Sequence, residues 1–261
     1  MRRILITGGP TNEYIDEVMK ITNMSSGKVA IQMAELFAEK DCGVTLLLTK
    51  TIKYFPTTDR IEVVRFETTR ELEDAIYKAS KENTYDAVIH SAAVADYKPE
   101  FSFRMEDMAC ELVEYLETRG KGATDMREVY DNIFEILTNP HCKVNDSTKI
   151  SSNESHLTVK LGLTTKIIYN LRKWFPDAFV CGFKLLENVS EKELVDAAMR
   201  IIDKSGVNMV FANDLANLRQ GKPERLVVAH KGVVGTAEGG ADGIVRVVLR
   251  HLDIKDVSQR T

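Results

Sequence analysis

Four short apolar runs in the first hundred residues constrain the fold of this chain more than any other feature of its sequence. They are Arg3–Thr7, Val44–Thr49, Ile61–Phe66 and Ala87–Ala93. Apolar residues at helical spacing separate the first run from the second and the third from the fourth. Short apolar runs that alternate with helices are typical of strands buried in a parallel sheet. The pattern therefore predicts an α/β fold with a doubly wound, Rossmann-like and mostly parallel sheet.

The second half of the chain continues this pattern and then changes to hairpin strands. Apolar runs at Phe179–Phe183 and Met209–Ala212 predict two further strands of the same sheet. Ser190 and Glu193 have the spacing of a capping box, which predicts the start of a helix. The two apolar runs within residues 226–236 predict a C-terminal β-hairpin.

The middle of the chain differs, because two amphipathic stripes follow one another. One covers residues 105–116 and the other residues 126–137, with two glycines in the stretch 120–122 between them. This predicts two antiparallel helices joined by a short loop, with their methionines in a core. We expect a single α/β domain over residues 1–261, with a helical insertion at about residues 101–145 and a flap region after it.

Composition and charge exclude several classes of function. The net charge is −4, whereas a nucleic-acid-binding protein usually has a basic surface. No stretch approaches the ~18 consecutive apolar residues of a membrane-spanning helix, and the first residues lack the layout of a signal peptide. The four cysteines are far apart in sequence, which favours reduced thiols over disulfides or a zinc site. We expect a cytoplasmic protein that binds neither nucleic acid nor membranes.

The loop Gly8–Thr11 follows a predicted strand, which suggests nucleotide binding, but two common nucleotide motifs are missing. The fingerprint G-x-G-x-x-G is absent, and the second strand ends in Thr49-Lys50, without an acidic residue to bind a ribose. Gly27-Lys28 is followed by Val29, where a Walker motif requires serine or threonine. These departures disfavour an NAD-dependent reductase and a P-loop nucleotidase.

Two features suited to phosphate lie in the connection after the first strand. The loop Gly8–Thr11 offers backbone N–H groups, and the segment Asn23–Lys28 lies where the first helix is expected to begin. Ser25 or Ser26 is expected to cap that helix, whose N-terminus attracts anions. The connection is unusually long, which is more often functional than not. A plain helix cap after a long loop is the alternative.

The fourth strand ends in Ser91-Ala92-Ala93-Val94-Ala95-Asp96. Small residues at the carboxyl end of a strand allow a ligand to lie against the backbone, and Asp96 has the chemistry to bind Mg²⁺ or a ribose hydroxyl. An aspartate that begins a surface turn is the alternative. Both alternatives also apply to Asn213-Asp214.

Several motifs occur in an order that resembles one known family. They are Ile6-Thr-Gly-Gly-Pro-Thr11, Asn23-Met-Ser-Ser-Gly-Lys28, Ser91-Ala-Ala-Val-Ala-Asp-Tyr97, Lys149-Ile-Ser-Ser152, Gly182-Phe183 and Phe211-Ala-Asn-Asp214. Over residues 1–98 and 146–252 the chain resembles phosphopantothenate–cysteine ligase, also called phosphopantothenoylcysteine synthetase, in its stand-alone bacterial form.

The resemblance implies a step of coenzyme A biosynthesis. CTP, or alternatively ATP, activates the carboxylate of 4′-phosphopantothenate as an acyl-nucleotide, an acyl-cytidylate with CTP, and pyrophosphate leaves. The amine of L-cysteine then forms the amide, and the nucleoside monophosphate leaves. The resemblance also implies a homodimer and Mg²⁺ on the triphosphate near Asp96, without a protein cage for the metal. Cations and backbone amides would offset the repulsion between a carboxylate and a phosphate.

The resemblance also assigns roles to individual residues. Asn23 matches an asparagine that holds the acyl group, Asp96 an acidic contact and Lys149 a lysine of a mobile flap, and these three are the expected catalytic residues. The expected substrate- and phosphate-binding residues are Gly9, Pro10, Thr11, Lys20, Ser25, Ser26, Gly27, Lys28, Ala92 and Ala93. The expected nucleotide-binding residues are Ser91, Asp96, Lys149, Thr165, Lys166, Ile167, Ile168, Phe183, Arg200 and Lys204.

Three departures from the family pattern leave questions open. The sequence after Lys149 lacks the further lysines of the fused bacterial form, so the choice between CTP and ATP stays open. Met19 stands where an arginine is common, and Lys20 is a substitute that cannot form a bidentate contact. The helical insertion is longer than the usual connection. A catalytically weak protein that binds nucleotide or phosphopantothenate is the alternative to the ligase.

Overall fold

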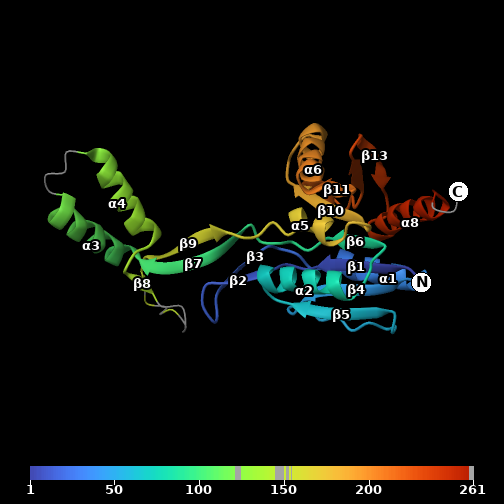
Figure 1. Ribbon diagram of the computed structural model, residues 1–261, viewed down its shortest axis with the longest axis horizontal. Helices are drawn as coiled ribbons and strands as arrows, with labels where there is room; N and C mark the ends of the chain where they lie inside the picture. The colour runs from blue at the N-terminus through green and yellow to red at the C-terminus, as the bar shows by residue number, and fades with distance from the viewer. Residues whose placement is uncertain (121–124, 145–149, 151–152, 154, 259–261) are drawn as a thin grey trace. The chain divides into compact units, whose positions relative to one another are not determined.

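The computed structural model describes residues 1–120, 125–144, 150, 153 and 155–258 (Figure 1). The chain divides into two compact units. The first unit comprises residues 1–11, 23–94 and 165–261, and the second unit comprises residues 12–22 and 95–164. Within the described residues, no helix is long and apolar enough to cross a membrane.

In the described part of the first unit, eight strands form one sheet in the order β13-β12-β11-β10-β6-β1-β4-β5. The strands from β11 to β5 pair in parallel, and β12 and β13 pair antiparallel. Their bounds are β1 Arg3–Gly8, β4 Gly43–Thr49, β5 Ile61–Phe66, β6 Ala87–His90, β10 Phe179–Leu186, β11 Met209–Asp214, β12 Arg225–Ala229 and β13 Gly232–Ala237. The expected parallel sheet and C-terminal hairpin are confirmed.

Helices cover both faces of this sheet, as a doubly wound fold requires. Ile4 and Ile6 pack with Phe37 of α1, whereas Leu5 packs with Ile76 of α2 on the other face. This alternation follows from the period of two in a strand. Helices α1 and α8 cover one face, and α2, α5 and α6 cover the other. The bounds are α1 Lys28–Glu39, α2 Thr69–Glu82, α5 Ile168–Trp174, α6 Glu191–Ser205, α7 Leu215–Arg219 and α8 Ala241–Ser258.

The second unit contains a three-stranded antiparallel sheet in the order β8-β7-β9 and a helical pair. The two helices are confirmed, but β7 was not expected, because Pro99 interrupts the alternation of its residues. A small hairpin of β2 and β3 occupies the long connection after β1. The bounds are β2 Asn12–Tyr14, β3 Lys20–Thr22, β7 Tyr97–Arg104, α3 Met105–Tyr115, a π-helical turn Leu116–Gly120, α4 Met126–Thr138, β8 Lys143–Val144 and β9 Leu157–Leu163.

The prediction that the methionines of this helical pair lie in a core is wrong for two of the three. Met108 is buried against Phe101 and Phe103 of β7. Met105 is 50% exposed and Met126 is 74% exposed, and no residue of α4 is buried in the described structure. Apolar spacing sets which residues of a helix share a face, but it does not determine what covers that face.

Candidate active site

Backbone hydrogen bonds join the loop after β1 to the segment after β6. The Thr11 N–H donates to the Ala93 carbonyl at 3.3 Å, and the Ala93 N–H donates to the Gly9 carbonyl at 2.9 Å. Pro10 forms a parallel bridge with Ala93. The strands β4 and β5 lie on one side of β1, and β6 and β10 lie on the other. Open α/β sheets bind ligands at the carboxyl ends of the strands where the strand order reverses in this way.

Thr7 organises the beginning of the segment after β6. Its Oγ1 accepts the Ala92 N–H at 3.1 Å and lies 2.9 Å from Nδ1 of His90, and its carbonyl accepts the Ser91 hydroxyl at 2.6 Å. Burial lowers the pKa of His90 to about 4, so the imidazole is neutral near pH 7. Sequence reasoning gave no role to Thr7 or His90. A polar residue at the end of an otherwise apolar strand was the only local signal.

Two glycines bring the loop after β1 close to the start of α1. The φ angles are 83° at Gly9 and 65° at Gly27, in the left-handed region. A Cβ on Gly27 would lie 3.3 Å from the backbone nitrogen of Gly9, and a Cβ on Gly9 would lie 2.5 Å from Cγ2 of Thr49. Both positions therefore require glycine, for conformation and for space.

The start of α1 differs from the expected serine cap. The residue at the cap is Gly27, and no side chain of the described residues caps this helix. Ser25 Oγ lies 3.5 Å from the Gly27 nitrogen, and Ser26 Oγ lies 3.4 Å from the Lys28 nitrogen, which are long for hydrogen bonds. The left-handed turn at Gly27 moves the start of the helix beyond both serines. The helix N-terminus and the exposed Lys28 still favour an anion.

Asn23 lies beside the segment after β6. Its Nδ2 donates to the Val94 carbonyl at 3.0 Å, and the residue is exposed. The structure therefore brings Asn23, the loop at Gly9 and the segment 91–94 to the same edge of the sheet, although about 70 residues separate Asn23 from Val94.

The segment Thr165–Ile168, expected to bind nucleotide, lies against β10. Thr165 and Lys166 are exposed, whereas Ile167 is buried in the core. A Cβ on Gly182 would lie 2.6 Å from Cδ1 of Ile168, so Gly182 makes room for this side chain. The next residue, Phe183, is half-buried, with its ring centre 5.4 Å from that of Phe211. Gly182 and Phe183 are neighbours in β10 and point to opposite faces of the sheet. The segment therefore packs on the face of α5 and α6, whereas the Phe183 ring lies on the face of α1 and α8.

Arg200 and Lys204 are not brought to this edge. Both are exposed on α6, which begins after β10 and runs back towards the amino ends of the strands. Just beyond the end of α6, the Asn208 N–H donates to the Val180 carbonyl near the start of β10 at 2.9 Å. The two cations in the last turns of α6 therefore lie at the far end of the strands from the loop at Gly9.

The remaining expected site residues lie in the second unit or outside the described residues. The Asp96 carbonyl accepts the Thr164 N–H at 3.0 Å, and its side chain is exposed. The ammonium of Lys20 lies 5.7 Å from the ring centre of Tyr14. Lys149 lies outside the described residues. Across the part of the chain that the structure describes, no group of three His, Cys, Asp or Glu residues is arranged to hold a metal ion.

Asp214 has a structural role. Its carboxylate accepts the Ala216 N–H at 2.7 Å and the Val189 N–H at 3.0 Å, which caps α7. The Val189 amide and further backbone amides hold the pKa of Asp214 below its usual value. Between the two alternatives that the sequence left open for this residue, the structure favours the aspartate that begins a turn.

Comparison with known proteins points to one family. Residues 1–106 match the family described as DNA/pantothenate metabolism flavoprotein C-terminal domain. The chain is 32% identical to the coenzyme A biosynthesis bifunctional protein CoaBC of Thermococcus kodakarensis. The 214 aligned residues cover 82% of this chain and 41% of that protein. It is 27% identical to the CoaBC of Methanocaldococcus jannaschii with the same coverage. The chain thus spans about two fifths of the length of these relatives.

Solved structures show the same fold. The DNA/pantothenate metabolism flavoprotein from Streptococcus pneumoniae has a TM-score of 0.77 at 25% identity, covering 98% of this chain and 100% of that one. A Cab2 mutant in complex with phosphopantothenate-cysteine has a TM-score of 0.66 at 16% identity, covering 100% of this chain and 89% of that one, and shows the fold alone. Together these matches confirm the resemblance of the chain to the phosphopantothenate–cysteine ligase family.

Proposed function

We propose that this protein ligates 4′-phosphopantothenate with L-cysteine in coenzyme A biosynthesis, with CTP as the activating nucleotide. One observation carries the proposal: Asn23 Nδ2 bonds to the Val94 carbonyl at 3.0 Å, which sets a side-chain amide next to the glycine loop and the small residues after β6. The matched relatives are named for coenzyme A biosynthesis, which supports this reaction class.

The electrostatics of the loop region suit the first half of the reaction. The carboxylate of phosphopantothenate attacks the α-phosphate of the nucleotide, forms a C–O–P linkage and displaces pyrophosphate. Both reactants are anions, so the enzyme must supply positive potential. The loop at Gly9, the N-terminus of α1 and the exposed Lys28 provide it. Bound Mg²⁺ would neutralise further charge on the triphosphate, and the exposed Asp96 carboxylate is the contact that we propose for it.

In the second half, Asn23 has the chemistry of an oxyanion donor. The cysteine amine attacks the acyl carbon, the C–N bond forms, the amine loses a proton and the nucleoside monophosphate leaves with the electrons of the C–O bond. Negative charge develops on the former carbonyl oxygen during this attack. An amide N–H aimed at that oxygen stabilises the transition state. Asn23 Nδ2 already faces a backbone carbonyl in the structure.

The decisive test of this role is Asn23→Asp. We expect nucleotide and phosphopantothenate to bind as before, and single-turnover pyrophosphate release to continue. Formation of the amide should fall by a factor on the order of 10² to 10³, because the donor is lost. Asn132→Asp, on α4, is the control and should leave turnover unchanged. Normal turnover of Asn23→Asp would show that Asn23 is structural.

The overall reaction is tested by pyrophosphate release with phosphopantothenate, L-cysteine and Mg²⁺, measured in parallel with CTP and ATP. We expect release with CTP that depends on phosphopantothenate, and loss of that release in Lys149→Gln. Folded protein that releases pyrophosphate with neither nucleotide would contradict the ligase and favour a binding protein of the same fold. Sedimentation of the same sample tests the homodimer that we propose.

A further inference from the structure

The loop after β4 packs against two glycines of the candidate site. A Cβ on Gly9 would lie 2.8 Å from Cδ1 of Ile52, and a Cβ on Gly27 would lie 2.5 Å from the same atom. Ile52 is half-buried and packs against the core on the α1 face of the sheet. One methyl group of Ile52 therefore lies against both the loop after β1 and the start of α1.

Arg65 of β5 holds the loop that carries Ile52. Its Nη1 donates to the Ile52 carbonyl at 2.7 Å, and its Nη2 donates to the Tyr54 carbonyl at 2.6 Å. The Thr49 carbonyl, at the end of β4, lies 3.4 Å from Nη1. Because the N–H groups of a planar guanidinium have fixed directions, these bonds fix the backbone on both sides of Ile52.

Strand alternation places these groups on one face of the sheet. Val63 of β5 packs in the core on the α1 face, and Arg65, two residues further along the strand, points to the same side. Ile52 and Tyr54 pack against that same core. The guanidinium, the loop and the start of α1 therefore meet on the α1 face of the sheet.

The two glycines do not determine this arrangement by themselves. Gly9 and Gly27 have no side chains, and glycine adopts many backbone conformations at little cost. Their segments, the loop after β1 and the N-terminus of α1, are the two that we propose to bind phosphate. A displacement of about 1 Å is enough to weaken a reaction strongly, so the spacing of these segments is important.

We propose that Ile52 and Arg65 are positioning residues of the ligase. Arg65 fixes the loop after β4, and the Ile52 methyl group sets the spacing between the loop at Gly9 and the start of α1. This inference rests on the proposed function, in which these two segments bind the phosphate groups of the substrates. Both residues act through the glycines and not through a contact with substrate.

The first test removes only the atom that packs against the glycines. Ile52→Val lacks Cδ1, and we expect the Kd for inorganic pyrophosphate, measured by calorimetry, to rise on the order of tenfold. The KM for CTP should rise with it. Ile201→Val is the matched control, because it removes the same methyl group from a half-buried isoleucine of α6. It should lower Tm about as much and leave the Kd unchanged.

The second test replaces the guanidinium. Arg65→Lys keeps the positive charge but cannot bond to the carbonyls on both sides of Ile52, so it should also raise the Kd for pyrophosphate. Arg172→Lys, on α5, is the control, because it likewise loses bonds to several backbone carbonyls. Both substitutions should lower Tm, but only Arg65→Lys should weaken binding. Adding Ile52→Val to Arg65→Lys should raise the Kd little further, because the two residues act through one contact.

The proposal would be overturned by equal Kd values in Ile52→Val and Ile201→Val, by equal values in Arg65→Lys and Arg172→Lys, or by a wild-type protein that does not bind pyrophosphate. The binding assay measures no catalysis. Wild-type protein that binds pyrophosphate but releases none from CTP would contradict the ligase, and the comparison of Kd values would still decide the role of Ile52 and Arg65.

Discussion

Arg172 of α5 joins three segments of the first unit through one guanidinium. It donates to the carbonyls of Gly206, Pro176 and Ala178 at 2.9–3.0 Å, and it also bonds to Oδ1 of Asn208. These acceptors lie beyond the end of α5 and beyond the end of α6. The planar guanidinium group has five N–H donors and can bond to all these acceptors at once, whereas the ammonium group of a lysine cannot.

We therefore expect Arg172→Lys to lower the free energy of unfolding by about 3 kcal/mol, because several hydrogen bonds to a charged group are lost together. Urea denaturation measures the change. Arg200→Lys, on the exposed face of α6, is the matched control and should change stability little. Equal changes in the free energy of unfolding for the two substitutions would show that the geometry of the Arg172 guanidinium does not contribute to stability.

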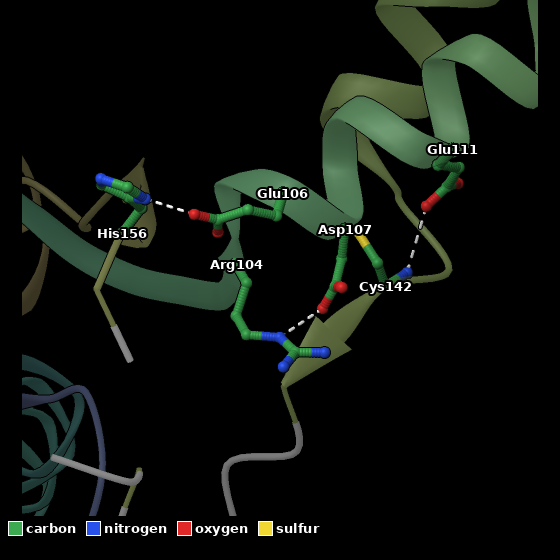
Figure 2. A network of polar contacts seen from close by, with 6 residues as sticks. All are labelled: Arg104, Glu106, Asp107, Glu111, Cys142 and His156. Carbon is green, nitrogen blue, oxygen red and sulfur yellow. Dashed lines mark hydrogen bonds and ion pairs between the residues drawn. The ribbon is translucent and has the colours of Figure 1, made fainter. Parts of the chain in front are cut away.

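At the level of elements, charged side chains fasten α3 to its neighbours in the second unit (Figure 2). Arg104 and Asp107 form an ion pair at the start of α3 with 2.5 Å between Nε and Oδ2. Further along the helix, the Glu111 carboxylate accepts the backbone N–H groups of His141 at 3.0 Å and Cys142 at 3.2 Å. Burial raises the pKa of Glu111, but these hydrogen bonds more than offset the effect and hold it below its usual value. Glu111 therefore fastens α3 to the segment before β8.

The same contact with Glu111 affects the pKa, and therefore the reactivity, of the Cys142 thiol. Burial and then the neighbouring Glu111 carboxylate raise the pKa of Cys142 to about 11. Because the thiolate is the reactive form, we expect Cys142 to react slowly with a disulfide reagent at pH 8, and Cys110, which is exposed on α3, to react quickly. Glu111→Gln should speed the reaction of Cys142, on the order of tenfold for each unit by which its pKa falls.

Cys110 serves as the internal control for this experiment, since its rate should not change. Glu114→Gln, which removes another acid of α3, should leave both rates as they are. If Glu111→Gln and Glu114→Gln act alike on Cys142, the contact with Glu111 does not set the reactivity of this thiol.

For the whole molecule, the buried His90 predicts a pH dependence of stability. Its pKa falls from 6.5 to about 4 on folding because burial disfavours the charged imidazolium. Between these two pH values the unfolded chain binds a proton that the folded chain does not, so stability falls as the pH decreases. The effect is absent above pH 6.5 and reaches about 3 kcal/mol near pH 4.

Urea unfolding at pH 7 and at pH 4.5 tests this expectation. Other groups also titrate in this range, so the informative quantity is the difference between wild type and His90→Asn, which should lose less stability on acidification. His230→Asn, in the exposed turn of the C-terminal hairpin, should behave as the wild type. The same pH dependence in wild type and in His90→Asn would contradict the role of His90.

Local features of the sequence determined most of the elements. Apolar runs placed the strands β1, β4, β5 and β6, because a buried strand requires apolar neighbours along the chain. The capping box at Ser190 and Glu193 placed the start of α6, and its hydrogen bonds are present in the structure. The spacing of apolar residues over 105–116 and 126–137 predicted the helices of the second unit. Each of these signals acts over a few residues.

The remaining features of the structure depend on contacts between residues that are far apart in the sequence. The left-handed turn at Gly27 forms where the backbone of Gly9 comes close, and no local rule for helix caps includes that approach. The exposure of the apolar stripe of α4 depends on which other surfaces lie near it.

The sequence by itself thus determined which residues form strands and helices, and which motifs resemble a ligase. The tertiary structure alone decided that Asn23 meets the Val94 carbonyl and that Asp214 caps a helix. The physical reason is the separation along the chain over which each kind of interaction acts. Propensity and periodicity act between neighbours in the chain, whereas burial and hydrogen bonding join residues that only the folded backbone brings together.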